Sequence, residues 1–190
     1  EGSTQRWETH REAMKSAVAR HDALVRAAIE HQRGYVFKTV GDAFCAAFRS
    51  SPDAINAAID VQRALTTEDF SAVDGLRARI GLHTGNADER DGDYFGPAVN
   101  RAARLMAIGH GGQVLLSAAT RELIHGDLPG SASLTGLGSH RLKDLTHAEQ
   151  VWQLTGAGLP GDFPPLKSLD ILPNNLPIQP TTFRGREHDL

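Results

Sequence analysis

Two short apolar runs joined by a glycine and an aspartate constrain this sequence most strongly. They form the stretch GYVFKTVGDAFCAAF at residues 34–48. Alternating apolar residues rich in β-branched and aromatic side chains favour strands, and Gly41 beside Asp42 supplies a tight turn. The stretch predicts a hairpin that presents the carboxylate of Asp42 at its tip. On this stretch alone, an ordinary turn with a solvated aspartate is the simpler interpretation. We expect four flanking aromatic side chains to lie in a core: Tyr35, Phe37, Phe44 and Phe48.

The composition describes a globular chain with one core. Its 190 residues are 40% hydrophobic and carry a formal charge of −3, a length that suffices for a single core. No Lys/Arg-rich run is present, so nucleic-acid binding is not expected. No apolar stretch approaches the ~20 residues of a membrane span and no secretory pattern is seen, which favours a cytoplasmic setting without membrane contact. Cys45 has no partner for a disulfide, and we expect it to be a buried apolar side chain.

Apolar residues at three- and four-residue spacing predict four helices. Ser3 or Thr4 is expected to cap the first, and Pro52 and Pro97 open the second and third. The expected helices extend up to about residue 32, and then over residues 51–65, 97–108 and 118–124. The third is expected to bury one apolar side: Val99, Ala102, Ala103 and Met106.

Strands are predicted between and after these helices. Strict alternation over residues 76–82 indicates a half-buried strand, and the charged residues 88–92 indicate a turn without regular structure. Later strands are expected at residues 113–116, 134–138 and 151–154. The resulting order, α, β, β, α, β, α, β, α, β, β, favours a mixed sheet covered by helices. From Gly156 the chain is rich in proline, with six of the nine prolines between Pro160 and Pro180, which predicts a linker.

Asn100 and Arg104 are four residues apart and therefore lie on one face of the third helix. An amide and a guanidinium one turn apart suit the recognition of a sugar and a phosphate, because arginine offers a planar fork of donors. A solvated helix face with a surface arginine is the alternative interpretation. His83, in the strand before them, is expected to be a structural hydrogen-bonding residue.

Four separated blocks, KTVGDAFCAAF, ARIGLHTG, DYFGPAVNRAAR and HRLKDL, together resemble the class III nucleotidyl cyclase catalytic domain. The resemblance covers residues 1 to about 154 and implies an α+β fold with a mixed, mainly antiparallel sheet covered by helices, a ferredoxin-like palm. The opening EGST resembles the end of that family's first strand motif, whose metal-binding aspartate would lie two residues before Glu1. The resemblance therefore implies a catalytic domain at residues 1–155 that lacks its first strand, followed by a linker at residues 156–190.

The resemblance also implies roles for individual residues. Asp42 matches a metal-binding aspartate, and Arg79 matches the arginine that contacts the outer phosphates. Lys38 and Asp93 match the pair that reads adenine: a lysine donor suits the N1 acceptor and a carboxylate suits the amino group. Guanine presents the reverse pattern at that edge, so the pair favours ATP over GTP.

Three further matches concern the sugar and the phosphates. Asn100 would hold the ribose, Arg104 would brace charge on the α-phosphate, and Lys143 would contact the triphosphate. Two Mg²⁺ or Mn²⁺ ions per site are implied. The resemblance implies a homodimer whose sites each take Asp42 and Arg79 from one subunit and four residues from the other: Lys38, Asp93, Asn100 and Arg104.

The implied function is an adenylate cyclase that converts ATP to 3′,5′-cyclic AMP and pyrophosphate within a signalling regulator. A catalytically silent dimerisation or nucleotide-sensing module stays open as the alternative. The tail NNLPIQPTTFRGREHDL resembles the entry segment of STAND-type ATPase regulators, which implies a downstream ATPase domain in a longer protein. A polar tail without structure is an equal alternative for it.

Overall fold

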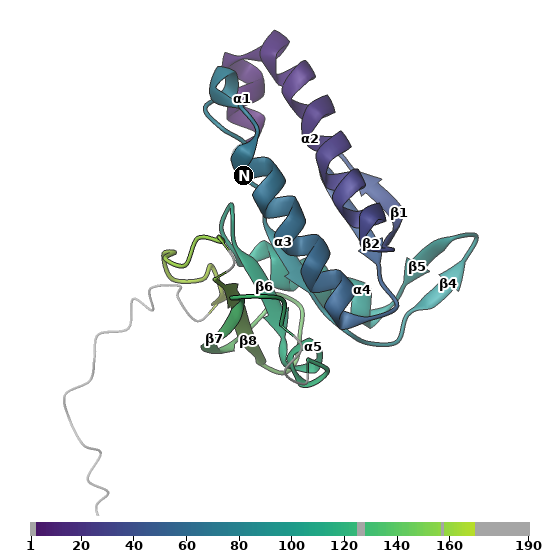
Figure 1. The fold of residues 1–190 in the computed structure, drawn as a ribbon. Coiled ribbons are helices and arrows are strands. Elements are labelled where there is room, and N and C mark those ends of the chain that lie inside the picture. Colours follow the sequence, from purple (N-terminus) through teal and green to yellow (C-terminus); the bar gives the residue numbers. More distant parts are fainter. Residues whose placement is uncertain (1–2, 125–127, 157, 170–190) are drawn as a thin grey trace, which may run out of the picture.

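The computed structural model describes residues 3–124, 128–156 and 158–169, which form helices packed against three β-sheets (Figure 1). In chain order the elements are α1 (Ser3–Thr9), α2 (Arg11–His31), β1 (Tyr35–Val40), β2 (Ala43–Ala47), α3 (Ser51–Thr67), the 3₁₀ turn η1 (Ser71–Val73), β3 (Ile80–Leu82), β4 (Asp88–Arg90), β5 (Asp93–Phe95), α4 (Pro97–Ala107), β6 (Val114–Ser117), α5 (Ala118–Glu122), β7 (Ser133–His140) and β8 (Glu149–Thr155).

The largest sheet has four strands in the order β3-β6-β8-β7. Its β3 and β6 run parallel, whereas β6, β8 and β7 pair antiparallel. The hairpins β1-β2 and β4-β5 are separate two-stranded sheets. This arrangement confirms the predicted α+β class with a mixed, mainly antiparallel sheet and helices.

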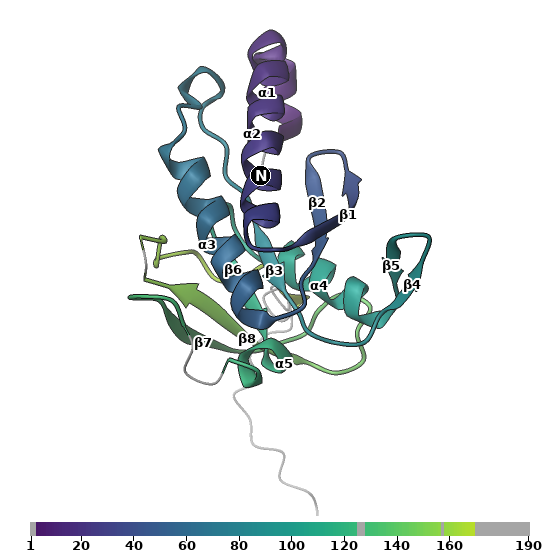
Figure 2. The same ribbon diagram turned by 45° about the vertical axis from the view of Figure 1, so that its right-hand side comes forward.

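Helices α2 and α3 lie side by side, and α3 and α4 both pack against β3 (Figures 1 and 2). Apolar residues of α2, α3 and η1 form one core cluster, which Phe44 and Phe48 cover from the β1-β2 hairpin. A second cluster joins α3 to β6 and β8, and a third joins α4 to β6. The core therefore runs between the helix pair and the four-stranded sheet.

Helix α4 approaches β3 so closely that only glycine fits at position 81. A Cβ atom on Gly81 would lie 2.6 Å from the backbone N of Met106 and 2.8 Å from the carbonyl O of Ala102. Contacts this short with backbone atoms cannot be relieved by a side-chain rotation. Gly81 therefore sets the distance between the sheet and the helix that carries Asn100 and Arg104.

The first predicted helix is interrupted. His10 has φ −129° and ψ 44° and separates α1 from α2, so Thr4 lies within α1 and does not precede one continuous helix. The ring of His10 lies 3.2 Å from Asp74 Oδ2, and Arg6 donates to the Asp74 carbonyl at 3.4 Å. These long-range contacts with the loop after η1 give α1 a direction of its own, which helical spacing cannot reveal.

One predicted strand is shorter than expected and one turn prediction was wrong. Of the predicted strand 76–82, Ile80–Leu82 forms β3 and pairs with β6, and the Ala78 carbonyl accepts from the Gly112 amide at 2.8 Å. Residues 88–92, predicted to lack regular structure, form β4 and the turn into β5. Asp91 and Gly92 both have positive φ, at 53° and 78°, the conformation that Asp-Gly favours in a two-residue hairpin. The turn chemistry outweighed the charged composition.

Some predicted core positions are also corrected. Tyr35 is 53% exposed, because it lies at the start of β1 and its hydroxyl donates to the Gly92 carbonyl at 3.1 Å. On α4, Ala103 is exposed and Leu105 is the fully buried residue. Leu105 belongs to the third core cluster, together with Leu115 of β6. The other residues of the predicted apolar side, Val99, Ala102 and Met106, are half-buried. Cys45 is likewise half-buried and free.

The segment predicted to begin the linker packs on the domain as far as Leu169. Leu166 is 4% exposed and Ser168 is 5% exposed. The remainder of the predicted linker, including the stretch that resembles STAND-type regulators, lies outside the described residues. Of the helices in the described part, none is long and apolar enough to cross a membrane.

Replacing Gly81 with alanine is expected to destabilise the fold by about 1–3 kcal/mol, because the added methyl group overlaps backbone atoms of α4. Denaturant unfolding followed by circular dichroism measures this. Gly161→Ala is the matched control, since its Cβ would meet nothing within 4 Å. Equal stabilities of the two variants would contradict the close packing of β3 and α4.

Candidate active site

The β1-β2 hairpin places Lys38 and Asp42 as the sequence predicted. Gly41 has φ 60° and allows the chain to reverse, so Asp42 lies exposed at the tip. The strand register shifts between Val36 and Lys38, which leaves Phe37 as an extra residue. Such a bulge re-aims the side chains that follow it. Lys38 therefore points away from the hairpin core and toward β5.

Lys38 forms an ion pair with Asp93 on β5. The hydrogen bond from this ammonium is the main reason that the pKa of Asp93 lies below its ordinary value, and the Tyr94 amide, which donates to Asp93 Oδ1 at 2.8 Å, lowers it further. The Lys38 Nζ also lies 5.3 Å from the centroid of the Phe95 ring. A cationic donor and a carboxylate acceptor thus stand side by side.

Asn100 and Arg104 lie on α4, directly after β5. Asn100 is exposed, and Arg104 Nη2 donates to Asp144 Oδ2 at 2.5 Å. Asp144 has φ 62° and follows Lys143, which is exposed. The structure therefore brings Arg104 and the Lys143 loop together, with the guanidinium group of Arg104 paired to a carboxylate oxygen of Asp144.

Asp42 lies in the β1-β2 turn, and Arg79 directly precedes β3. Arg79 donates to the Ala107 carbonyl at the end of α4, at 3.4 Å. Among the described residues, no hydrogen bond or ion pair joins Asp42 or Arg79 to Asn100, Arg104 or Lys143. Arg79 thus contacts the carboxyl end of the helix that carries Arg104, and Asp42 lies in the turn of the hairpin that carries Lys38.

Asp42 is the predicted metal ligand, and its setting fits a Mg²⁺ or Mn²⁺ site only in part. Magnesium is commonly held by one or two carboxylates together with substrate phosphates, and an exposed carboxylate at a rigid tip suits that role. In the described parts of the chain, no group of three or more His, Cys, Asp or Glu side chains is placed to hold an ion. Ligands beyond Asp42 would have to come from the substrate or from elsewhere.

A polar network that the sequence did not reveal holds α4 in place. Arg101 donates to Glu149 Oε2 on β8 at 3.1 Å, and the Ala118 amide donates to the other oxygen of Glu149 at 3.3 Å. The Glu149 side chain is only 9% exposed. Because this carboxylate is paired on both oxygens, it fixes the helix that carries Asn100 and Arg104 to the central sheet.

His83 lies next to this network and is hydrogen bonded, as predicted. Its Nδ1 is 2.8 Å from Ser117 Oγ, and Thr120 bonds the Leu82 carbonyl nearby at 3.2 Å. Burial lowers the pKa of His83, and the charge of Arg101 lowers it further. The imidazole is therefore neutral at pH 7, in keeping with a structural role.

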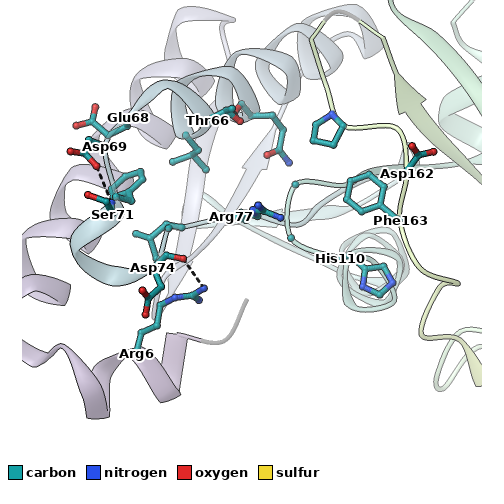
Figure 3. A pocket seen from close by; sticks show the side chains of 18 of the residues that line it. Arg6, Thr66, Glu68, Asp69, Ser71, Asp74, Arg77, His110, Asp162 and Phe163 are labelled. Atoms are coloured by element: carbon teal, nitrogen blue, oxygen red, sulfur yellow. Dashed lines mark hydrogen bonds between the residues drawn. The ribbon is translucent and has the colours of Figure 1, made fainter.

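A cavity of about 850 Å³ lies elsewhere in the described part of the chain. It is bounded by α1, the η1 loop, residues 110–112 and residues 160–164, and Figure 3 shows Arg77, His110 and Phe163 around it. None of the predicted site residues lines it. Its wall mixes basic and acidic side chains, so it has no consistent charge for one class of ligand.

A family model described as the adenylate and guanylate cyclase catalytic domain matches residues 1–156. The chain belongs to this family. The match includes Lys38, Asp93, Asn100 and Arg104, whose arrangement is described above.

Curated and solved relatives agree with the cyclase family. An uncharacterized protein of Mycobacterium tuberculosis is 43% identical over 98% of this chain, which spans 64% of that protein. The receptor-type adenylate cyclase GRESAG 4.2 of Trypanosoma brucei brucei is 30% identical over 81% of this chain and 34% of its own length.

Two solved cyclases share the fold. A Trypanosoma brucei adenylate cyclase, solved in its monomeric state, superposes with a TM-score of 0.77 at 27% identity, covering 88% of this chain and 90% of its own. An adenylate/guanylate cyclase/hydrolase from Silicibacter pomeroyi gives a TM-score of 0.69 at 30% identity, covering 82% and 90%.

Replacing Lys38 with methionine is expected to raise the pKa of Asp93 toward the ordinary carboxyl value, because its main hydrogen-bond donor is lost. Carboxyl NMR titration measures this. Because the pKa of Asp93 is lowered in the folded protein, the pair stabilises the fold at pH values above the ordinary carboxyl pKa. This stabilisation is lost as the pH falls through the lowered pKa of Asp93. Lys15→Met, at the remote pair with Glu12, is the control. An unchanged Asp93 titration in Lys38→Met would contradict the pairing.

Proposed function

We propose that this chain is the catalytic domain of an adenylate cyclase, which converts ATP to 3′,5′-cyclic AMP and pyrophosphate. The observation that carries the proposal is the Lys38 and Asp93 pair. Its members are charged and adjacent, so that one offers a donor and the other an acceptor. Adenine presents an acceptor at N1 beside an amino donor, and guanine presents the opposite pattern.

The sugar and phosphates would lie along α4. Asn100 is exposed and free to donate its amide to a ribose oxygen, and Arg104 lies one turn further along the same face. Arg104 donates to an anionic oxygen of the Asp144 carboxylate, and a phosphate group offers oxygens of the same kind. A nucleotide phosphate would replace that carboxylate, and Lys143 would add a second positive charge beside it.

The reaction needs little from the protein beyond orientation and charge. The ribose 3′ oxygen attacks the α-phosphorus, its proton leaves to solvent or base, and the bond to the pyrophosphate oxygen breaks. Asp42 would hold divalent cations, two per site and either Mg²⁺ or Mn²⁺, which lower the pKa of the 3′ hydroxyl and neutralise the triphosphate. Arg104 would hold the charge that develops on the α-phosphate.

The site is proposed to form between two copies of the chain. In the part of the chain that the structure describes, no hydrogen bond or ion pair joins Asp42 or Arg79 to Asn100 or Arg104, although the proposed chemistry requires them together. Val40, beside Asp42 at the hairpin tip, is 62% exposed and supplies apolar surface for such an interface. A symmetric homodimer would complete two equivalent sites.

Purified protein incubated with Mn²⁺ and an equal mixture of ATP and GTP is expected to yield cyclic AMP in excess of cyclic GMP by at least about tenfold, because the wrong base leaves Lys38 and Asp93 unpaired. Chromatography of the products measures this. Lys38→Glu combined with Asp93→Asn reverses the donor pattern and should lower the ATP preference.

Arg104→Ala is expected to lower kcat about 100-fold with folding intact, because a donor to the developing charge is lost. Arg121→Ala, on α5, is the matched control, since this arginine pairs with the adjacent Glu122 and lies over the Trp152 ring, away from α4. Nucleotide binding by a confirmed dimer without any product would contradict the proposed activity and favour a silent nucleotide-sensing module. Preferential formation of cyclic GMP would instead contradict the assignment of the base.

A further inference from the structure

Residues 159–169 lie beyond the stretch that the cyclase family model matches, yet they pack on the domain. We call them the C-terminal strap. Within it, Leu166 and Ser168 are buried, whereas Lys167 and Leu169 are exposed. This alternation shows an extended segment with one face against the domain, although the proline content predicts only a linker. Two of its contacts fall on segments that adjoin candidate site residues.

The first place is the carboxyl end of α4. The Lys167 amide donates to the Ile108 carbonyl at 2.9 Å, directly at the C-cap of that helix. The side chain of Leu166 packs in one cluster with Leu105 and Ile108. The strap therefore satisfies one of the carbonyls that a helix end leaves without a partner, and it covers the residue next to Arg104.

The second place is the loop that carries Lys143. The Leu169 amide donates to the Arg141 carbonyl at 3.2 Å, and Leu142, 1% exposed, shares the cluster of Leu166. The Nε2 atom of His140 lies 3.0 Å from the Leu137 carbonyl oxygen, and its Nδ1 atom lies 3.0 Å from Ser168 Oγ. A neutral ring donates to the carbonyl and accepts from the Ser168 hydroxyl, so both of its nitrogens are used.

The outer part of the strap is anchored as well. Phe163 stacks on His110 with ring centroids 6.4 Å apart and planes 10° from parallel (Figure 3). The Nε2 atom of His110 donates to the Pro165 carbonyl at 3.1 Å. Gln153 on β8 donates to the Gly161 carbonyl at 2.8 Å. The strap is therefore held along its length and does not merely touch the domain at one point.

We propose that the C-terminal strap, through Leu166, is a positioning element that fixes Arg104 relative to Lys143. The two side chains come from segments separated along the chain. The Arg104 and Asp144 ion pair joins these segments directly, and Leu166 of the strap packs with Leu105 and Ile108 on one side and Leu142 on the other. A phosphate would displace the ion pair, and the apolar cluster that Leu166 completes would then hold the two segments. A displacement of about 1 Å in such a group can cost on the order of 100-fold in rate.

The inference that the strap serves phosphate positioning rests on the proposed function, so its test has a readout that is independent of activity. Leu166→Ala removes the buried contact, Leu166→Met restores its volume, and Asp162→Ala, at an exposed position of the same strap, is the control. The unfolding midpoint temperature of each variant is measured first. The values of kcat, KM for ATP and amide hydrogen exchange are then measured at a temperature well below that midpoint.

We expect Leu166→Ala to lower kcat about tenfold or more with a smaller change in KM, and Leu166→Met and Asp162→Ala to stay close to the original. Amide exchange at residues 105–109 and 141–145 should rise about threefold or more in Leu166→Ala, with the β1-β2 hairpin unaffected. Unchanged exchange at those two segments would overturn the proposal, as would a loss of kcat that only follows the unfolded fraction. If no variant makes a cyclic nucleotide, the proposed function fails, and the exchange experiment still decides whether the strap ties the two segments.

Discussion

The contact between Lys38 and Asp93 is the interaction on which the candidate site depends. It joins two hairpins that share no strand pairing, and it is supported by the Tyr35 hydroxyl on the Gly92 carbonyl and by the edge-to-face contact of Phe37 with Tyr94. Helix α4 begins two residues after β5. The position of β5 therefore sets where the helix starts, and with it where Asn100 and Arg104 lie relative to the base-reading pair.

The remainder of the fold holds that helix from its other sides. Gly81 allows α4 to lie directly on β3, and the buried Glu149 binds Arg101 from β8. The strap contacts its carboxyl end through Lys167 and Leu166. A rigid helix carrying an amide and a guanidinium suits a reaction in which catalysis rests on geometry and charge rather than on a protein nucleophile. The family membership and this arrangement agree.

Local patterns predicted much of the fold, and contacts between distant residues account for what they missed. The hairpin at Asp42 and the start of α4 at Pro97 follow from turn and capping chemistry, which acts within a few residues. The break at His10 involves Asp74, and Leu105 is buried in a cluster with distant residues such as Leu115 and Leu166, so neither is visible in helical spacing. The β4-β5 hairpin did have a local signal, Asp91-Gly92, but its charged surroundings concealed it. The motif resemblance named Lys38 and Asp93 as a pair. The ion pair of Arg104 with Asp144 and the network around Glu149 were found only in the structure.

The central claim is that one site draws residues from two copies of the chain, and mixing two damaged variants tests it most directly. Asp42→Ala and Asn100→Ala would each be assayed alone and after mixing under conditions that allow subunit exchange. We predict low cyclic AMP formation for each variant alone and recovery to about a quarter of the original activity in the mixture. Half of the dimers in an equal mixture would contain one copy of each variant, and each of these dimers would carry one intact site of two. Activity in the mixture equal to the mean of the two variants, with exchange confirmed, would contradict the shared site.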